Sequence, residues 1–140
     1  MQYTLQDLRA IYDRTSGYCH ICGKKLALSN YGRFGDKGAW EVEHSNARVK
    51  GGTDRLNNLY PACISCNRSK GTVTTRTARA REDRKRAPLS REKRAAARRE
   101  NAIIGGGLSF IGAAALAGTG WGIVAAAVGA YAGYKTNPDK

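Results

Sequence analysis

Four cysteines stand in two pairs that share one spacing. The first C-x-x-C pair is Cys19 and Cys22, and the second is Cys63 and Cys66. This spacing lets one tight turn present both sulfurs to a single ion, and zinc prefers four soft ligands in a tetrahedron. Because four protein ligands leave no open position for substrate, we expect a structural zinc site; buried or redox-active thiols are the alternative. His20, inside the first pair, is expected to be exposed and outside the ligand set.

The residues between and just after these pairs are suited to phosphodiester hydrolysis. Glu43 and His44 are adjacent, and Asn67 directly follows the second pair. A neutral histidine, whose ordinary pKa is about 6.5, can take a proton from water. A hard divalent cation with few protein ligands keeps positions open for phosphate and water, and Glu43 and Asn67 offer the oxygen atoms that it prefers. Each of these residues alone would be interpreted as structural. Their order, between and just after the two C-x-x-C pairs (the two zinc knuckles), favours a catalytic role.

The ordered motifs resemble one known family. They are Glu43-His44, Gly51-Gly52, Asn58-Leu59 and residues 63–71 (CISCNRSKG). In order and spacing they are similar to the HNH endonucleases, whose pattern is an acid-His pair, a Gly-Gly turn, an Asn-Leu, and a C-x-x-C followed by His or Asn and then Lys-Gly. Residues 4–23 look like the zinc-containing branch of that family. Glu in place of Asp before the histidine is a departure that keeps an oxygen ligand.

The resemblance implies a role for each matching residue. His44 is similar to the general base, and Glu43 and Asn67 match the positions that hold the catalytic divalent ion, Mg²⁺ or Mn²⁺. Asn58 matches the asparagine that braces the loop and orients the histidine. The implied fold is a ββα-metal unit of two short strands and a helix. Three basic residues beside the site are expected to contact phosphates: Arg48, Arg68 and Lys70.

The elements that must position these residues are short, and they predict an α+β fold stapled by the four-cysteine zinc site. Thr4 has the character of a helix N-cap, and apolar residues then recur at helical spacing as far as Ser16–Gly17. Residues 29–38 predict a loop, residues 39–43 a strand and residues 63–70 a helix that Gly71 closes. We therefore expect an HNH nuclease domain over residues 1–75.

The composition indicates a polyanionic partner. The formal net charge is +13, and residues 76–100 alone hold eleven Lys and Arg against four Asp and Glu. Nucleic acid and anionic lipid are the two candidate partners. We interpret residues 76–100 as a basic linker with a helix over 91–100, capped by Ser90. The polar start of the chain is unlike a secretory signal, which favours a reducing cytosol and zinc over disulfides.

Residues 101–134 carry no charge, and residues 135–140 form a polar tail. Gly118, Gly122, Ala126 and Ala130 recur at four-residue intervals, which resembles a glycine zipper. Three interpretations compete: a single membrane anchor, a hydrophobic helical hairpin that inserts or self-associates, and a soluble Gly/Ala-rich oligomerisation tail. The absence of charge favours membrane association.

These patterns together predict a metal-dependent endonuclease acting on DNA, with RNA not excluded. We expect it at the cytoplasmic face of a membrane, or otherwise in the cytoplasm, with a role in phage defence or toxin action. One alternative is a non-catalytic zinc module that binds nucleic acid, whose tail acts by membrane insertion or oligomerisation. Another is a soluble phage packaging or homing nuclease.

Overall fold

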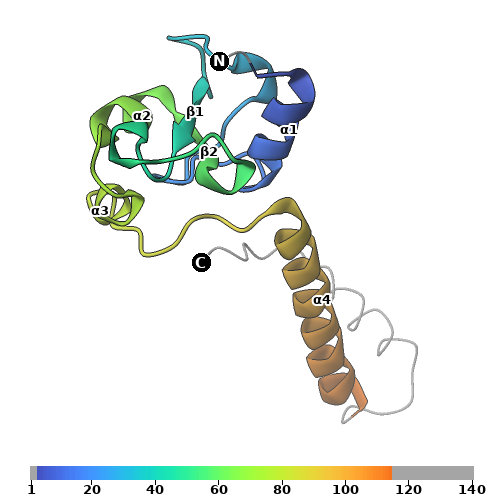
Figure 1. Ribbon diagram of the computed structural model, residues 1–140. Coiled ribbons are helices and arrows are strands. Elements are labelled where there is room, and N and C mark those ends of the chain that lie inside the picture. The colour runs from blue at the N-terminus through green and yellow to red at the C-terminus, as the bar shows by residue number, and fades with distance from the viewer. Residues whose placement is uncertain (1–2, 115–140) are drawn as a thin grey trace. The chain divides into compact units, whose positions relative to one another are not determined.

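The computed structural model describes residues 3–114, and side chains as far as residue 104 (Figure 1). The described chain is a small α+β protein with a two-stranded sheet, as predicted. Its helices and strands are α1 (Leu5–Asp13), β1 (Trp40–His44), β2 (Leu59–Cys63), α2 (Ile64–Lys70), α3 (Thr75–Ala80) and α4 (Arg91–Ala114). Short 3-10 turns lie at Leu28–Asn30, Arg48–Lys50 and Leu56–Asn58.

Helix α1 begins with reciprocal capping, as its sequence predicts. Thr4 Oγ1 accepts from the Asp7 amide at 3.1 Å, and the Asp7 carboxylate accepts from the Thr4 amide at 3.0 Å. The helix ends one turn earlier than expected, at Asp13. Gly17, at φ +72°, donates its amide to Tyr12 O and turns the chain away, and the ring of Tyr12 leaves no room there for a Cβ.

Strands β1 and β2 pair antiparallel. Strand β1 carries Glu43 and His44, and β2 ends at Cys63 of the second cysteine pair. The register places Trp40 opposite Cys63 and His44 opposite Leu59. Because α2 begins directly after β2, it folds back over the sheet and lies beside β1 (Figure 1). Residues near position 43 and residues of α2 are thereby brought together from separate parts of the chain.

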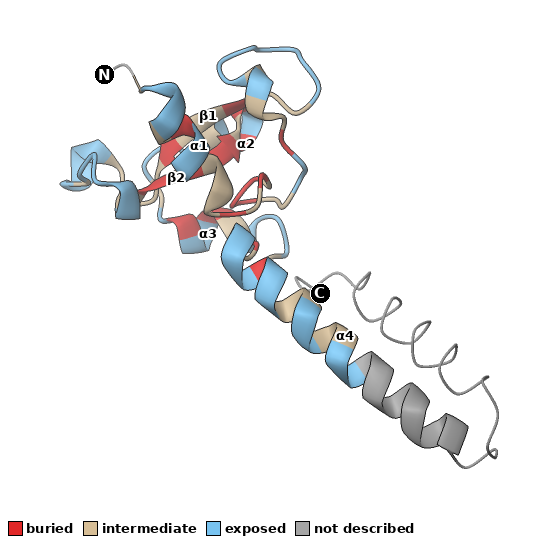
Figure 2. Ribbon diagram, turned by 90° about the vertical axis from the view of Figure 1, so that its right-hand side faces the viewer, coloured by how far each residue is buried: buried red, intermediate tan, exposed pale blue. Residues whose placement is uncertain are grey.

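The hydrophobic core lies between α1, the sheet and the first knuckle (Figure 2). Its largest fully buried apolar side chains are Trp40, Ile11, Ile21 and Leu59. Ala78 of α3 belongs to the same core. The domain therefore extends past the boundary expected at residue 75, because α3 covers apolar surface that residues 1–75 would leave open to water.

The chain divides into two units, Met1–Arg91 and Glu92–Lys140. Helix α4 begins at Arg91, as predicted from Ser90, and continues through the expected end at Glu100 to Ala114. Among the residues that the structure describes, no helix is long and apolar enough to cross a membrane. Most of the segment expected to form a glycine zipper, residues 115–134, lies outside the described residues.

Candidate metal centre and active site

The four cysteines converge as the two pairs predict. The sulfurs of Cys19, Cys22, Cys63 and Cys66 all lie within 4.8 Å of one another. Zinc–sulfur bonds of about 2.3 Å in a tetrahedron place the sulfurs about 3.8 Å apart. The Cys22 and Cys63 sulfurs are 3.8 Å apart, so the cluster has the dimensions of a zinc site.

The protonation of these thiols also favours a metal ion. Hydrogen bonds from the other three thiols lower the pKa of Cys19. The pKa values of Cys22 and Cys66 are raised, chiefly by their hydrogen bonds to Cys19. Ionisation of one thiol is thus favoured, and ionisation of the thiols beside it is disfavoured. A divalent cation relieves this conflict and lets all four sulfurs ionise, so the residues fit zinc.

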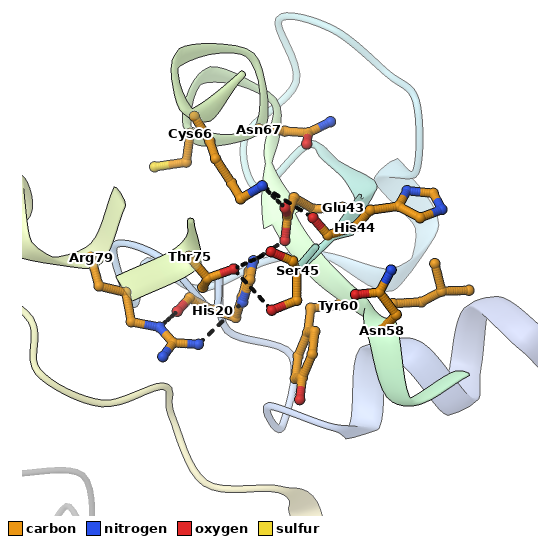
Figure 3. Close-up of polar contacts among 12 residues, drawn as sticks. His20, Glu43, His44, Ser45, Asn58, Tyr60, Cys66, Asn67, Thr75 and Arg79 are labelled. Atoms are coloured by element: carbon orange, nitrogen blue, oxygen red, sulfur yellow. Dashed lines mark hydrogen bonds and ion pairs between the residues drawn. The ribbon is translucent and has the colours of Figure 1, made fainter. Parts of the chain in front are cut away.

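A buried ionic cluster connects the first knuckle to β1 and α2. The two carboxylate oxygens of Glu43 lie 2.5 Å from His20 Nε2 and 2.7 Å from Lys70 Nζ. All three side chains are buried, and Lys70 also donates to His44 O at 3.1 Å. Figure 3 shows His20, Glu43 and His44 in this part of the site. Burial alone would raise the pKa of Glu43, but hydrogen bonds and charges from His20 and Lys70 outweigh it, so this pKa is lowered.

This cluster differs from two sequence-based expectations. Lys70 is buried with its ammonium group committed to Glu43 and the His44 carbonyl, an arrangement that argues against contact with a phosphate. His20 is fully buried instead of exposed. It stacks on Tyr60 at 4.9 Å between ring centroids, and Arg79 Nε donates to its carbonyl at 2.9 Å. Sequence spacing gave no signal for His20, because its partners lie 23 or more residues away.

The structure brings Asn67 to Glu41 and not to Glu43. Asn67 Nδ2 donates to Glu41 Oε2 at 2.9 Å, and Arg68 lies 3.5 Å from the other oxygen. Glu41 and Glu43 are two residues apart on a strand, so both face α2, but each meets a different turn of that helix. Glu41 is half-buried at the surface, whereas Glu43 is enclosed. Glu41 was not among the residues predicted for the site, although the E-x-E spacing in β1 was a usable signal.

His44 contacts Asp54, an acid that was also absent from the predicted site. Its Nε2 lies 2.7 Å from Asp54 Oδ1, which also accepts from Arg48 Nε at 2.9 Å and Nη2 at 2.6 Å. Hydrogen bonds from His44 and then Arg48 lower the pKa of Asp54, which is therefore an acceptor only. Arg48 Nε also lies 3.2 Å from His44 Nε2. We assign the His44 proton to Nε2, where it faces the Asp54 carboxylate, and Nδ1 has no hydrogen-bond partner among the described residues.

Asn58 braces the loop that presents Asp54. Its amide nitrogen donates to Asn46 O at 3.0 Å and to Thr53 O at 2.8 Å, and its oxygen accepts from the Asn46 amide at 2.7 Å. Gly52 closes the same loop, where an added Cβ would lie 1.8 Å from Asn46 O. Asn58 thus orients His44 indirectly, because it fixes the loop that holds Asp54 against the His44 imidazole.

An open groove lies beside the loop that carries Asp54, although neither Asp54 nor His44 is among the residues that line it. It has a volume of about 470 Å³, and its lining includes Ser45, Lys50, Thr53, Asn58 and Thr74. Arg68 lies on the exposed side of α2, while Arg48 is half-exposed and pairs with Asp54. Of the three basic residues expected to contact phosphates, these two have side chains at the surface.

Comparison with known proteins gives one match. Residues 19–72 match the family model for HNH endonucleases. The matched range includes both cysteine pairs, β1, the loop with Asp54, β2 and α2. No curated protein and no solved structure matches the chain significantly.

Proposed function

Because residues 19–72 form an HNH endonuclease domain, we propose that the protein hydrolyses phosphodiester bonds of nucleic acid, with DNA as the expected substrate. The observation that carries this proposal is the His44–Asp54 pair, which lies within the matched range and is held by Arg48. Four sulfurs are committed to a structural zinc site, which leaves the histidine and nearby oxygen atoms for chemistry.

In this proposal His44 is the general base. Asp54 holds the Nε2 proton, so Nδ1 is the nitrogen that can accept a proton from water as the water attacks phosphorus. Arg48 fixes Asp54 through two hydrogen bonds, and Asn58 fixes the loop behind it. The imidazole therefore has one orientation before substrate arrives, which lowers the entropic cost of reaching the transition state.

The family also implies a catalytic divalent ion. Glu43 does not fit as its ligand here, because both of its oxygens are taken by Lys70 and His20. Glu41 and Asn67 fit better, since Glu41 lies near the surface and an ion can displace its contacts with Asn67 Nδ2 and Arg68, whereas Glu43 is enclosed. We place the ion with these two residues; when bound, Mg²⁺ or Mn²⁺ would stabilise negative charge on the phosphate and the leaving oxygen.

Binding of Mn²⁺ tests this assignment separately from activity. With the zinc site loaded, Glu41→Gln is expected to abolish Mn²⁺ binding measured by electron paramagnetic resonance. Glu43→Gln serves as the matched variant and should retain binding wherever the variant stays folded. Loss of Mn²⁺ binding in Glu43→Gln but not in Glu41→Gln would instead identify Glu43 as the ligand.

Plasmid cleavage by the purified full chain tests the function itself. Wild type with Mg²⁺ or Mn²⁺ should nick supercoiled DNA, and His44→Ala should reduce the rate at least about a hundredfold, the usual contribution of a positioned base. Zinc content and Trp40 emission would show that the variant is folded. If folded, zinc-loaded wild type cleaves neither DNA nor RNA with either ion, the protein is a binding module and the nuclease proposal fails.

Location is a separate proposal, motivated by the uncharged segment 101–134. We propose attachment to the cytoplasmic face of a membrane, with self-association through the small residues of this segment. The full chain should float with vesicles, whereas a chain truncated after Glu100 should not, and both should cleave DNA in solution. A full chain that stays with the soluble fraction would contradict attachment, and would favour the soluble phage nuclease over phage defence or toxin action at a membrane.

A further inference from the structure

The loop between η1 (Leu28–Asn30) and β1 presents two aromatic side chains to solvent. Phe34 is 75% exposed and Tyr31 is 36% exposed. The Tyr31 ring is held edge-on against Trp40, with 5.1 Å between centroids. Phe34 contacts the Arg68 guanidinium, which lies 5.0 Å from the centre of its ring. The loop is therefore joined to the core at one aromatic residue and to α2 at the other.

Hydrogen bonds hold this loop in one conformation. The Gly32 amide donates to Trp40 O at 2.9 Å, and the Asp36 amide donates to Arg33 O at 3.2 Å. Asn30 Nδ2 donates across the loop to Lys37 O at 3.0 Å. Gly32 and Gly35 take positive φ values of 70° and 96° on either side of Phe34. Phe34 is thus presented by a preorganised turn, so binding through it costs little ordering entropy.

The charges around Phe34 define what the surface can bind. Arg68 lies against its ring, Arg33 and Lys37 belong to the same loop, and Asp36 is the single acid of residues 31–37. Arginine and lysine attract phosphate, and an exposed aromatic face stacks on a nucleobase without regard to its identity. In a regular duplex the faces of the bases are covered by their neighbours and only their edges are accessible. This surface therefore fits an unpaired base.

We propose that the surface formed by Tyr31, Arg33, Phe34, Lys37 and Arg68 binds single-stranded nucleic acid, with a base stacked on Phe34. The inference rests on the proposed function, and it narrows the substrate to a strand with unpaired bases beside the cut. The position is consistent with that role, because Arg68 and Asn67 are consecutive on α2 and both contact Glu41.

Binding measured without cleavage tests this proposal. The full, zinc-loaded chain carrying His44→Ala would be titrated against a fluorescein-labelled oligothymidylate and against a duplex of equal length, with anisotropy as the readout. Adding Phe34→Ala is expected to weaken single-strand binding about five- to a hundredfold. Phe34→Leu should weaken it similarly, because leucine is apolar but has no aromatic face, and Phe34→Trp should restore it.

Two controls separate stacking from loss of charge or fold. Leu5→Ala removes another exposed apolar side chain, on α1, and should leave binding unchanged. Phe34→Ala should not change the slope of the logarithm of the binding constant against the logarithm of the salt concentration. Arg68→Ala should reduce the size of that slope by about 0.7, the value for one phosphate contact on a single strand.

Each outcome decides one of the two proposals. If Phe34→Ala stays within twofold of its parent, or if Phe34→Leu binds as well as Phe34→Trp, the stacking proposal is overturned. If single strands bind through Phe34 but wild type cleaves nothing, the stacking surface stands and the nuclease proposal fails. If the parent prefers duplex to single strand, the substrate class is overturned while cleavage is unaffected.

Discussion

The buried contact between Glu43 and Lys70 gives the most direct test of how this domain is held together. Lys70→Met removes the ammonium group but keeps a stem of similar length, so little packing is lost. Glu43 would remain enclosed with a carboxylate that has lost one of its two partners. Removing one partner of a buried ion pair usually costs about 3–5 kcal/mol. Because His20 remains at 2.5 Å, we expect a loss near the lower bound, about 3 kcal/mol.

The assay is urea unfolding of the full chain at one fixed zinc concentration, since bound metal shifts apparent stability. Trp40 is fully buried and reports unfolding once Trp121→Phe has removed the second tryptophan. Lys37→Met is the matched control at an exposed lysine and should change the free energy of unfolding by less than about 0.5 kcal/mol.

A double-mutant cycle completes the test. Glu43→Gln removes the charge that Lys70 balances, so adding Lys70→Met to it should cost less than Lys70→Met alone. The expected coupling between the two residues is about 1–3 kcal/mol. A single Lys70→Met variant as stable as the Lys37→Met control, or a cycle with no coupling, would refute the view that the ion pair stabilises the site.

The same geometry leads to three further predictions. Removing zinc with a chelator, or replacing Cys63 by Ser, should unfold the domain, because the four sulfurs join residues 19–22 to residues 63–66; retention of buried Trp40 emission in the chelated protein would contradict this. Asp54→Asn should slow cleavage at least tenfold while Asp36→Asn should not, since only Asp54 holds the Nε2 proton of His44; equal rates in a plasmid-nicking assay would remove Asp54 from the mechanism. Thr4→Ala should cost about 1 kcal/mol in urea unfolding through loss of the α1 cap, and an unchanged midpoint would show that α1 does not need it.

The sequence alone determined features that depend on neighbours along the chain. Paired cysteines at one spacing predicted the metal cluster, Thr4 and Asp7 predicted the start of α1, and Ser90 predicted the start of α4. The order of motifs between the knuckles was sufficient to identify the HNH domain. Such features are local, because a cap or a knuckle is complete within a few residues.

Only the tertiary structure decided which side chains meet. Strand alternation turns both Glu41 and Glu43 toward α2, but the packing of that helix pairs Asn67 with Glu41 and Lys70 with Glu43. Lys70 looked like a surface cation, yet it is buried because the knuckle and α2 close over Glu43. Burial and pairing across 23 to 27 residues depend on how separate elements pack, and spacing along the chain does not encode that packing.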